Sequence, residues 1–167
     1  YCGAKPVFAD INPETYNIDP ASVEKCVTDK TKAVVAVDYT GQSAELEPLR
    51  KLCREKNLVL IEDGAHVIGT TYQGRKNGSI SDMTMFSFHP VKTVTAGEGG
   101  AVLTNSEEYY RKLLLYRAHG ITRDERLLEH ESDGPWYYEQ LMLGYNYRMT
   151  DMQAALLISQ LDKLEMF

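Results

Sequence analysis

The chain alternates short apolar runs with longer segments in which apolar residues recur at helical spacing. Five apolar runs are bounded by polar or turn residues, which is typical of buried strands in an α/β sheet. They span residues 6–9, 33–37, 58–61, 83–88 and 101–103. Because helical segments separate most of these runs, we predict a mostly parallel sheet with right-handed crossovers, flanked by helices.

Two segments between the first strands carry helix signals. Residues 20–27 begin with Pro20 directly after Asp19, and these residue types are favoured at the first helical position and at the N-cap. Residues 46–56 repeat apolar side chains at helical spacing, so they predict a helix with one buried face. That face consists of Leu46, Leu49, Leu52 and Cys53.

Two further helices are predicted in the second half of the chain. Asn105 and Glu108 have the spacing of a capping box, and Gly120 is a suitable stop. Thr150 opens another helix, which continues toward Phe167. Its apolar stripe favours ordinary packing, against a missing part of the protein or a partner subunit, over a binding groove. The stripe consists of Ala154, Leu157, Ile158, Leu161 and Leu164.

Residues 121–144 lack a clear periodic pattern. They are polar, mixed in charge and interrupted by Asp133-Gly134-Pro135, so we predict a long surface excursion. Within this segment, Trp136-Tyr137-Tyr138 forms an aromatic cluster. Such a cluster would either shield a site or dock onto the core.

Composition narrows the class of protein. Hydrophobic residues make up 43% and charged residues 25% of the 167 residues, so the chain is expected to bury a core. The net charge of −6 argues against nucleic acid, because phosphate binding needs clustered Lys and Arg. No apolar stretch is long enough to cross a bilayer, so no membrane partner is expected.

The spacing of the cysteines bears on the compartment, and the spacing of the histidines bears on metal binding. Three cysteines without a C-x-x-C pair argue against a disulfide scaffold, and four histidines lack the close spacing of metal ligands. We therefore expect a reduced, cytoplasmic protein that holds no metal. The chain opens with Tyr1-Cys2-Gly3 and closes within a helical run, so we expect it to be a fragment of a longer protein.

Lys92 is the first candidate for chemistry. It follows the apolar run Phe86-Ser87-Phe88 and precedes the turn Gly97-Glu98-Gly99-Gly100. A lysine held between an apolar strand and tight turns loses hydration, which favours the neutral, nucleophilic amine that a Schiff base requires. The alternative is an ordinary solvated loop lysine.

Asp63, His66 and Ser87 lie just past the ends of two predicted strands, where parallel sheets bind ligands. Taken alone, Asp63 could cap a helix, and Ser87 carries little information. Taken with Lys92, these residues supply an amine for an imine, a carboxylate for a ring nitrogen and a hydroxyl for a phosphate. Those are the needs of pyridoxal 5′-phosphate (PLP).

Four motifs in order resemble the DegT/DnrJ/EryC1/StrS family of sugar-nucleotide aminotransferases. They are the runs 61–66, 86–92 and 97–100 described above and the run 144–155, Gly-Tyr-Asn-Tyr-Arg-Met-Thr-Asp-Met-Gln-Ala-Ala. The resemblance covers essentially the whole chain. It implies the central part of the large domain of a fold-type I PLP-dependent transferase, spanning residues 1–167, with an N-terminal segment and a small C-terminal domain absent.

The resemblance also implies residue roles. Lys92 forms the imine with PLP, Asp63 pairs with the pyridine nitrogen, and Ser87 binds the phosphate. His66 stands where many members carry Gln and lies near the phenolic oxygen of the cofactor. The remaining roles fall on Asn146 at the phosphate, reaching from a neighbouring subunit, and on Arg148 and His89 at the substrate. The family therefore implies a homodimer with shared active sites.

The runs 37–42 and 134–139 look most like the branch of the family that makes the 4-amino sugar precursor of pseudaminic acid. This resemblance implies transfer of nitrogen from an amino-acid donor, glutamate, to C4 of a UDP-linked 4-keto-6-deoxy amino sugar. The chain by itself is expected to have negligible activity, because the family's glycine-rich phosphate turn, stacking aromatic ring and small domain lie outside it.

Three other classes of function compete with this interpretation. A PLP-dependent sugar dehydratase of the same fold carries histidine in place of the lysine, so Lys92 argues against it. A non-catalytic sensor or assembly domain would not need Lys92, Asp63 and Ser87 together. A nicotinamide-binding Rossmann domain is disfavoured because no G-x-G-x-x-G follows an early strand.

Overall fold

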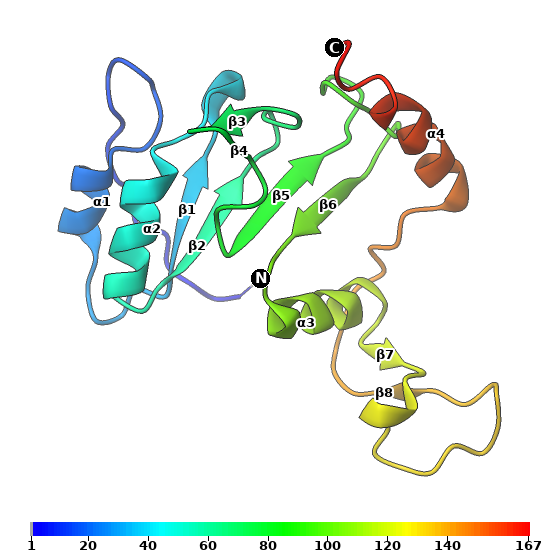
Figure 1. Cartoon of the computed structure of the whole chain (residues 1–167). Coiled ribbons are helices and arrows are strands. Elements are labelled where there is room, and N and C mark those ends of the chain that lie inside the picture. The colour runs from blue at the N-terminus through cyan, green and yellow to red at the C-terminus, as the bar shows by residue number, and fades with distance from the viewer. Residues whose placement is uncertain (1) are drawn as a thin grey trace. The chain divides into compact units, whose positions relative to one another are not determined.

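The computed structural model describes residues 2–167 and divides them into two compact units (Figure 1). The first unit comprises the chain up to Asn105 together with Met152–Phe167, and the second comprises Ser106–Asp151. The helices are α1 (Pro20–Cys26), η1 (Tyr39–Gly41), α2 (Leu46–Glu55), α3 (Glu107–Arg117), η2 (Glu125–Leu127) and α4 (Asp151–Leu161). The strands are β1 (Ala33–Val37), β2 (Val59–Asp63), β3 (Thr71–Tyr72), β4 (Arg75–Lys76), β5 (Met83–Ser87), β6 (Gly100–Leu103), β7 (Ile121–Thr122) and β8 (Glu139–Gln140).

The first unit is built on a four-stranded sheet with the order β1-β2-β5-β6. Strands β1, β2 and β5 are parallel, and β6 runs antiparallel to β5. The connection from β5 to β6 consists of turns without a helix, so the chain reverses instead of crossing over. The predicted mostly parallel sheet flanked by helices is confirmed, with β6 as the antiparallel exception.

Helices α1 and α2 form where the sequence predicts them. The carboxylate of Asp19 accepts hydrogen bonds from the backbone N–H groups of Ala21 and Ser22, and Pro20 occupies the first helical position. Helix α2 packs against β1 and β2, and α1 lies beside α2. The predicted apolar face of α2 is buried, and it forms the core together with Val34, Ala36 and Leu60 of the sheet.

The strands were predicted to be buried, and in the described residues the burial is concentrated on one face of the sheet. Strand β1 alternates, with Val34 and Ala36 buried against the core and Val35 and Val37 exposed on the other face. Met85 of β5 is also exposed on the open face. Successive side chains of a strand point to opposite faces, and α1 and α2 cover one of them.

The predicted strand at residues 6–9 is wrong. This segment is extended but belongs to no sheet among the described residues, and Val7 and Phe8 are exposed. Two contacts directly after this segment hold the chain. The N–H of Asp10 donates to the Ser22 hydroxyl, and Ile11 forms a single β-bridge with Ile18. An apolar run becomes a strand only where a neighbouring backbone pairs with it.

The second unit contains α3 and the antiparallel pair β7–β8. The predicted capping box at Asn105 is wrong, because Ser106 is the N-cap and its hydroxyl accepts from the N–H of Tyr109. The predicted excursion at residues 121–144 contains β7, η2 and β8, so it is more ordered than expected. Trp136 within it is exposed and meets Tyr137 edge to face.

Glu139 of β8 organises the loop before it. Its carboxylate accepts from the backbone N–H groups of Glu129 and His130 and from the Tyr137 hydroxyl, and it pairs with the His130 ring. These contacts, led by the backbone donor at Glu129, lower the pKa of Glu139 to about 2. The carboxylate therefore stays charged, and the loop stays closed on it, through the ordinary pH range.

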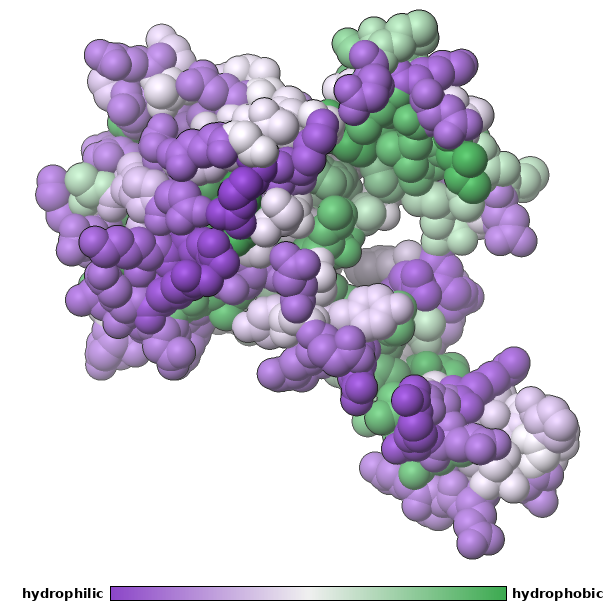
Figure 2. All heavy atoms as spheres, viewed as in Figure 1, coloured by the Kyte–Doolittle hydropathy of each residue, from purple (hydrophilic) through white to green (hydrophobic). Residues whose placement is uncertain are grey.

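Helix α4 begins one residue after Thr150, close to the predicted start, but it ends at Leu161 and continues as hydrogen-bonded turns. Much of its apolar surface is exposed, including Met152, Ile158 and Leu161, and Figure 2 shows hydrophobic side chains gathered on this helix. Leu164 packs near Gly69. None of the helices among residues 2–167 is both long and apolar enough to cross a membrane.

The two faces of β1 can be compared with one matched pair of variants. We expect Val34→Thr to lower the free energy of unfolding by about 2 kcal/mol, because it buries a hydroxyl in the core. Val35→Thr makes the same chemical change on the open face, so its effect is expected to stay below about 0.5 kcal/mol. Urea unfolding of residues 1–167 measures both, and equal losses would contradict the one-sided core.

Candidate active site

Three loops meet at the carboxyl end of the parallel strands and surround a hollow of about 330 Å³. The hollow is lined by Thr40 after β1, Ala65 and His66 after β2, and Val91, Lys92 and Thr93 after β5. The strands bring these loops together because their parallel register aligns Val37 with Asp63 and Asp63 with Met85. The structure thus places Lys92 and His66 in one site.

The turn that carries Lys92 is anchored on both sides by buried residues. Phe88 before it and Val94 after it are buried, and the N–H of Phe88 donates to the carbonyl of Gly99. The N–H of Lys92 donates to the carbonyl of His89, which closes the turn. Its side chain is half-buried, and among residues 2–167 no carboxylate lies within ion-pair distance of its amine. This placement favours a lysine that acts in the hollow over a solvated loop lysine.

Asp63 is the last residue of β2 and is half-buried. One of its carboxylate oxygens accepts from the N–H of Ala65 at 3.2 Å. The residues that follow form turns, so Asp63 does not cap a helix, which was the alternative role considered for it. Asp63 lies beside the hollow along the chain but does not line it.

Ser87 ends β5 opposite Gly100 of β6, and its hydroxyl accepts from the N–H of His89 at 3.3 Å. A side chain at Gly100 would collide with the carbonyl of Phe86, so only glycine lets the two strands approach this closely. His89 is exposed, and its ring accepts from the N–H of Val91. Ser87 and His89 flank the hollow but do not line it.

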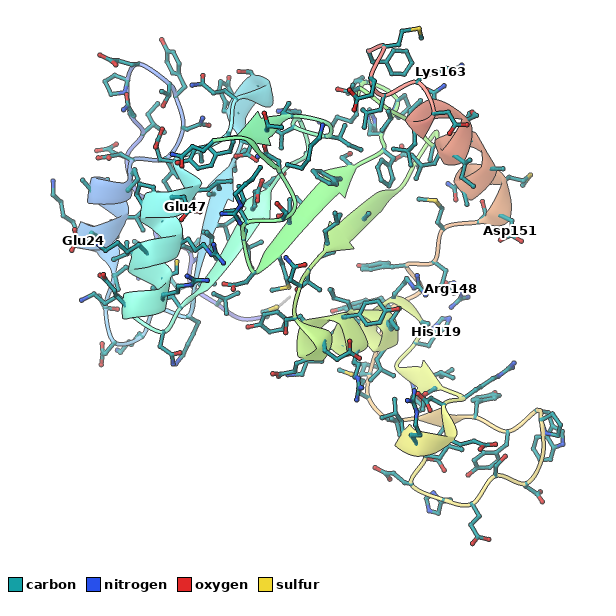
Figure 3. The ribbon with its side chains drawn as sticks, viewed as in Figure 1. Glu24, Glu47, His119, Arg148, Asp151 and Lys163 are labelled. Carbon is teal, nitrogen blue, oxygen red and sulfur yellow. The ribbon has the colours of Figure 1, made fainter. Side chains whose placement is uncertain are left out.

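Asn146 and Arg148 belong to the second unit, and both are exposed; Arg148 is labelled in Figure 3. They alternate with Tyr145 and Tyr147, whose rings stack at 4.8 Å between centroids. The two tyrosine rings occupy one side of this extended segment, so Asn146 and Arg148 project from the other side. Backbone hydrogen bonds from Tyr145 and Tyr147 to the end of α3 hold the segment in place.

Sequence reasoning missed two residues that line the hollow, Thr40 and Thr93. Thr40 adopts a left-handed backbone conformation with φ 55°, which turns the chain sharply after β1. A signal for it was available, because Thr40 precedes a glycine just past the end of a predicted strand. Thr93 follows Lys92 directly, and its neighbour Val94 is wholly buried.

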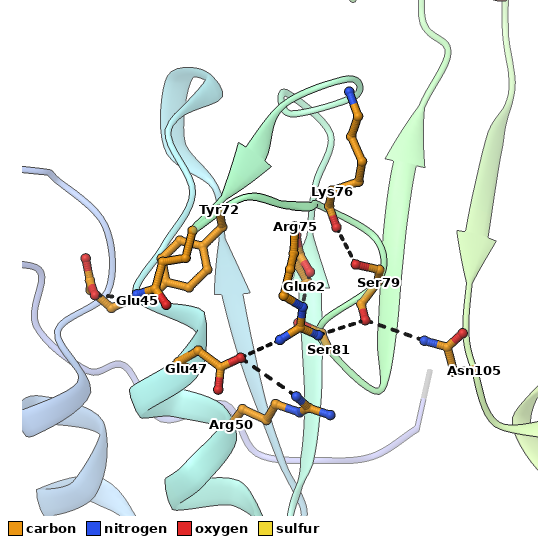
Figure 4. A network of polar contacts seen from close by, with 11 residues as sticks. Glu45, Glu47, Arg50, Glu62, Tyr72, Arg75, Lys76, Ser79, Ser81 and Asn105 are labelled. Atoms are coloured by element: carbon orange, nitrogen blue, oxygen red, sulfur yellow. Dashed lines mark hydrogen bonds and ion pairs between the residues drawn. The ribbon is translucent and has the colours of Figure 1, made fainter.

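Two buried carboxyl groups, Asp38 and Glu62, lie beneath these loops and are wholly inaccessible to solvent. The carboxylate of Glu62 accepts from Asn77 at 2.9 Å, Ser81 at 2.9 Å and Thr84 at 2.8 Å. Figure 4 shows Glu62 and Ser81 beside the network around the β3–β4 hairpin. No buried side-chain nitrogen or oxygen lacks a partner within the described residues, as a stable polar core requires.

The acidity of Asp38 differs from that of an ordinary aspartate. Burial raises its pKa to about 7, and the neighbouring charge of Glu62 acts in the same direction, while hydrogen bonds from Ala44 and Asn77 oppose the shift.

The donor set of the site fits PLP. Lys92 offers an amine for the aldehyde, Asp63 a carboxylate for the ring nitrogen, and Ser87 a hydroxyl for the phosphate. The hollow beside Lys92 opens to solvent next to Val91, which is exposed.

A mostly parallel α/β sheet with a lysine-lined hollow at its strand ends is the arrangement expected of a fold-type I PLP-dependent transferase, and solved aminotransferase structures share this fold. The particular family follows from comparison with known proteins. The chain belongs to the DegT/DnrJ/EryC1/StrS aminotransferase family, whose model matches residues 1–167.

The relatives and solved structures agree with this assignment. The UDP-4-amino-4,6-dideoxy-N-acetyl-beta-L-altrosamine transaminase of Campylobacter jejuni is 42% identical over 98% of this chain and 42% of its own length. The structure of Helicobacter pylori PseC, an aminotransferase involved in the biosynthesis of pseudoaminic acid, superposes with a TM-score of 0.89 at 38% identity, over 98% of this chain and 42% of that one.

A structure of Spr1654 from Streptococcus pneumoniae, described as a sugar aminotransferase in its PLP-form, has a TM-score of 0.86 at 31% identity. It is matched over 98% of this chain and 44% of that one. The chain therefore spans less than half the length of the proteins it matches.

The pKa of Asp38 predicts how stability depends on pH. The folded protein binds a proton at Asp38 up to about pH 7, whereas the unfolded chain releases it near pH 4, so stability falls as pH rises between these values. The loss is expected to reach up to about 4 kcal/mol over this range.

Urea unfolding at pH 5 and pH 8 measures this loss. We expect Asp38→Asn to abolish most of it, because the amide does not titrate. Asp82→Asn is the matched control, since Asp82 also accepts from a backbone N–H, that of Leu60, but is exposed and should leave the loss unchanged. An identical pH dependence in Asp38→Asn and the unmodified protein would contradict the assignment.

Proposed function

We propose that the full-length protein is a PLP-dependent sugar-nucleotide aminotransferase. It transfers nitrogen from glutamate to C4 of a UDP-linked 4-keto-6-deoxy amino sugar. The observation that carries this proposal is the half-buried Lys92 in a hollow at the carboxyl end of a parallel sheet, which His66 also lines. The family and the altrosamine transaminase among the relatives support the substrate class.

Three residues hold PLP in this proposal. Asp63 would hold the ring nitrogen protonated, Ser87 would donate its hydroxyl to the phosphate, and Lys92 would supply the amine for the aldehyde. His66 lies near the phenolic oxygen of the ring. When bound, the cofactor supplies an electron sink that weakens the bonds at the substrate carbon beside the nitrogen.

Lys92 also moves the proton. When it is not attached to the cofactor, the Lys92 Nζ would take a proton from the α-carbon of the amino donor and would later deliver one, acting first as base and then as acid. In the second half-reaction the same nitrogen moves a proton in the opposite direction.

The remaining assignments concern assembly and location. Asn146 reaches the cofactor phosphate of a neighbouring subunit, and Arg148 and His89 contact the sugar nucleotide, so a homodimer forms two shared sites. The exposure of Asn146 and Arg148 on one side of a fixed segment supports this arrangement. The free thiols of Cys2, Cys26 and Cys53 support a reducing, cytoplasmic setting.

Residues 1–167 form the central part of the large PLP-binding domain in this proposal, with an N-terminal segment and a small C-terminal domain supplied by the rest of the polypeptide. The matched length of the relatives supports this, because the chain spans 42% of the altrosamine transaminase. The chain alone therefore has negligible transaminase activity.

Reduction with borohydride tests the role of Lys92 in the full-length protein. After incubation with PLP, the reduced cofactor is expected on the peptide that contains Lys92, and Lys92→Arg should remove it. The same variant should lower kcat for the UDP-linked 4-keto sugar by about a thousandfold or more. Lys51→Arg is the control, because Lys51 is exposed and pairs with Glu55 on α2. A reduced adduct on any other lysine would refute the proposal.

Mixing inactive variants tests the shared sites. Lys92→Arg and Asn146→Ala subunits, mixed in equal amounts and allowed to exchange, are expected to regain about one quarter of the unmodified activity, because each hybrid dimer contains one intact site. Mixing Lys92→Arg with Asp63→Ala should restore nothing, since both residues come from the same subunit. Absence of recovery in the first mixture, with dimers present, would contradict the shared arrangement.

A further inference from the structure

Asp38 and Glu62 form a buried pair of carboxyl groups that the proposed reaction does not use. Asp38 and Glu62 are both wholly buried, and one amide, that of Asn77, donates to both at 3.3 Å and 2.9 Å. The pair lies on the core face of the sheet, because Glu62 aligns with buried Ala36 of β1 and Thr84 of β5.

Asp38 is tied directly to the walls of the hollow. One oxygen of its carboxyl group accepts from the N–H of Ala44 at 2.8 Å, which closes the loop that contains Thr40. Its own backbone N–H donates to the carbonyl of Asp63 at 3.1 Å. The same loop packs against the backbone of His66 at Gly41.

Glu62 is tied to the other side of the site. It directly precedes Asp63 on β2, and the two side chains point to opposite faces of the strand. Its partners Ser81 and Thr84 belong to the start of β5 and the turn before it, so Glu62 joins β2 to the strand that leads to Ser87 and Lys92.

No positive charge compensates the pair within the described residues. Its partners are the uncharged side chains of Asn77, Ser81 and Thr84 and one backbone amide. The basic residues of the adjoining hairpin are engaged elsewhere. Arg75 pairs with Glu47 (Figure 4), and Lys76 pairs with Glu165. Two buried carboxyl groups without a cation cannot both be ionised at low cost, so one proton remains between them.

We propose that Asp38 and Glu62 share one proton and act together as positioning residues, holding the Thr40 loop and the Asp63 strand end in register around the hollow. The shared proton turns a repulsive contact into a hydrogen bond from Asp38 to Glu62. Loss of the shared proton leaves two negative charges that repel each other. Their repulsion displaces Ala44, whose N–H is bonded to Asp38, and with it the Thr40 wall of the hollow. The effect on the positions of the loop and the strand end does not depend on any reaction, whereas the effect on catalysis rests on the proposed function.

Carbon-13 NMR of side-chain carboxyl groups tests the shared proton without any cofactor or substrate. In the full-length protein, one carboxyl group is expected to titrate near neutral pH, and Asp38→Asn should remove that signal. Asp82→Asn should leave it in place. If every aspartate and glutamate titrates below about pH 5, the ordinary range for these groups, the proposal is overturned.

Steady-state kinetics test the positioning role. Asp38→Asn keeps an acceptor for Ala44 and supplies an N–H donor to Glu62, so kcat/KM is expected to remain within about twofold of the unmodified enzyme. Asp38→Ala removes both contacts and should lower kcat/KM by about tenfold to a hundredfold, because it displaces a wall of the site. Equal losses in the two variants would overturn the proposal.

Two further measurements distinguish a failure of this proposal from a failure of the proposed function. Hydrogen exchange at the Ala44 N–H should accelerate in Asp38→Ala but not in Asp38→Asn, and this holds whatever reaction the protein catalyses. If Asp38→Ala does not fold, the exchange and titration of the unmodified protein still decide the question. If the unmodified protein forms no reduced PLP adduct, the proposed function fails while the titration still reports on the pair.

Discussion

The candidate site depends on the parallel hydrogen bonding of β1, β2 and β5. Parallel strands end at the same edge of a sheet, so the loops that follow them must meet there. The pairing continues past the strands, since the N–H of Asp38 donates to Asp63 and the N–H of Gly64 donates to Met85. This continued ladder brings Thr40, His66 and Lys92 around one hollow although they lie far apart in the sequence.

The same geometry separates two acids that are adjacent in the sequence. Because side chains alternate along a strand, Glu62 points into the core and Asp63 points to the other face of the sheet. A slip of one residue in the register of β2 would exchange these positions and leave a carboxylate unpaired in the core. The polar partners around Glu62 therefore help to specify the register that the site requires.

The sequence predicts the elements that depend on local chemistry. Strands β1, β2, β5 and β6 and helix α2 lie within one or two residues of their predicted bounds, and the cap at Asp19 forms as expected. The failures depend on distant partners. Residues 6–9 are apolar but find no strand to pair with among the described residues, and Ser106 replaces Asn105 as a cap because both residue types compete for that position. The one-sided burial of the sheet also depends on which layers of helix are present, which periodicity does not reveal.

For the candidate site, the sequence by itself determined the candidate groups and the strand ends that carry them, because a lysine, an acid and a hydroxyl at such positions already limit the chemistry. Lys92, Asp63, His66 and Ser87 could be selected in this way. Only the tertiary structure decided that Lys92 and His66 line the same hollow, that Thr40 and Thr93 join them, and that Asp38 and Glu62 meet beneath it. The physical reason is that side-chain chemistry is a property of single residues, whereas proximity, burial and the resulting acidity are created by the hydrogen-bonded register of neighbouring strands.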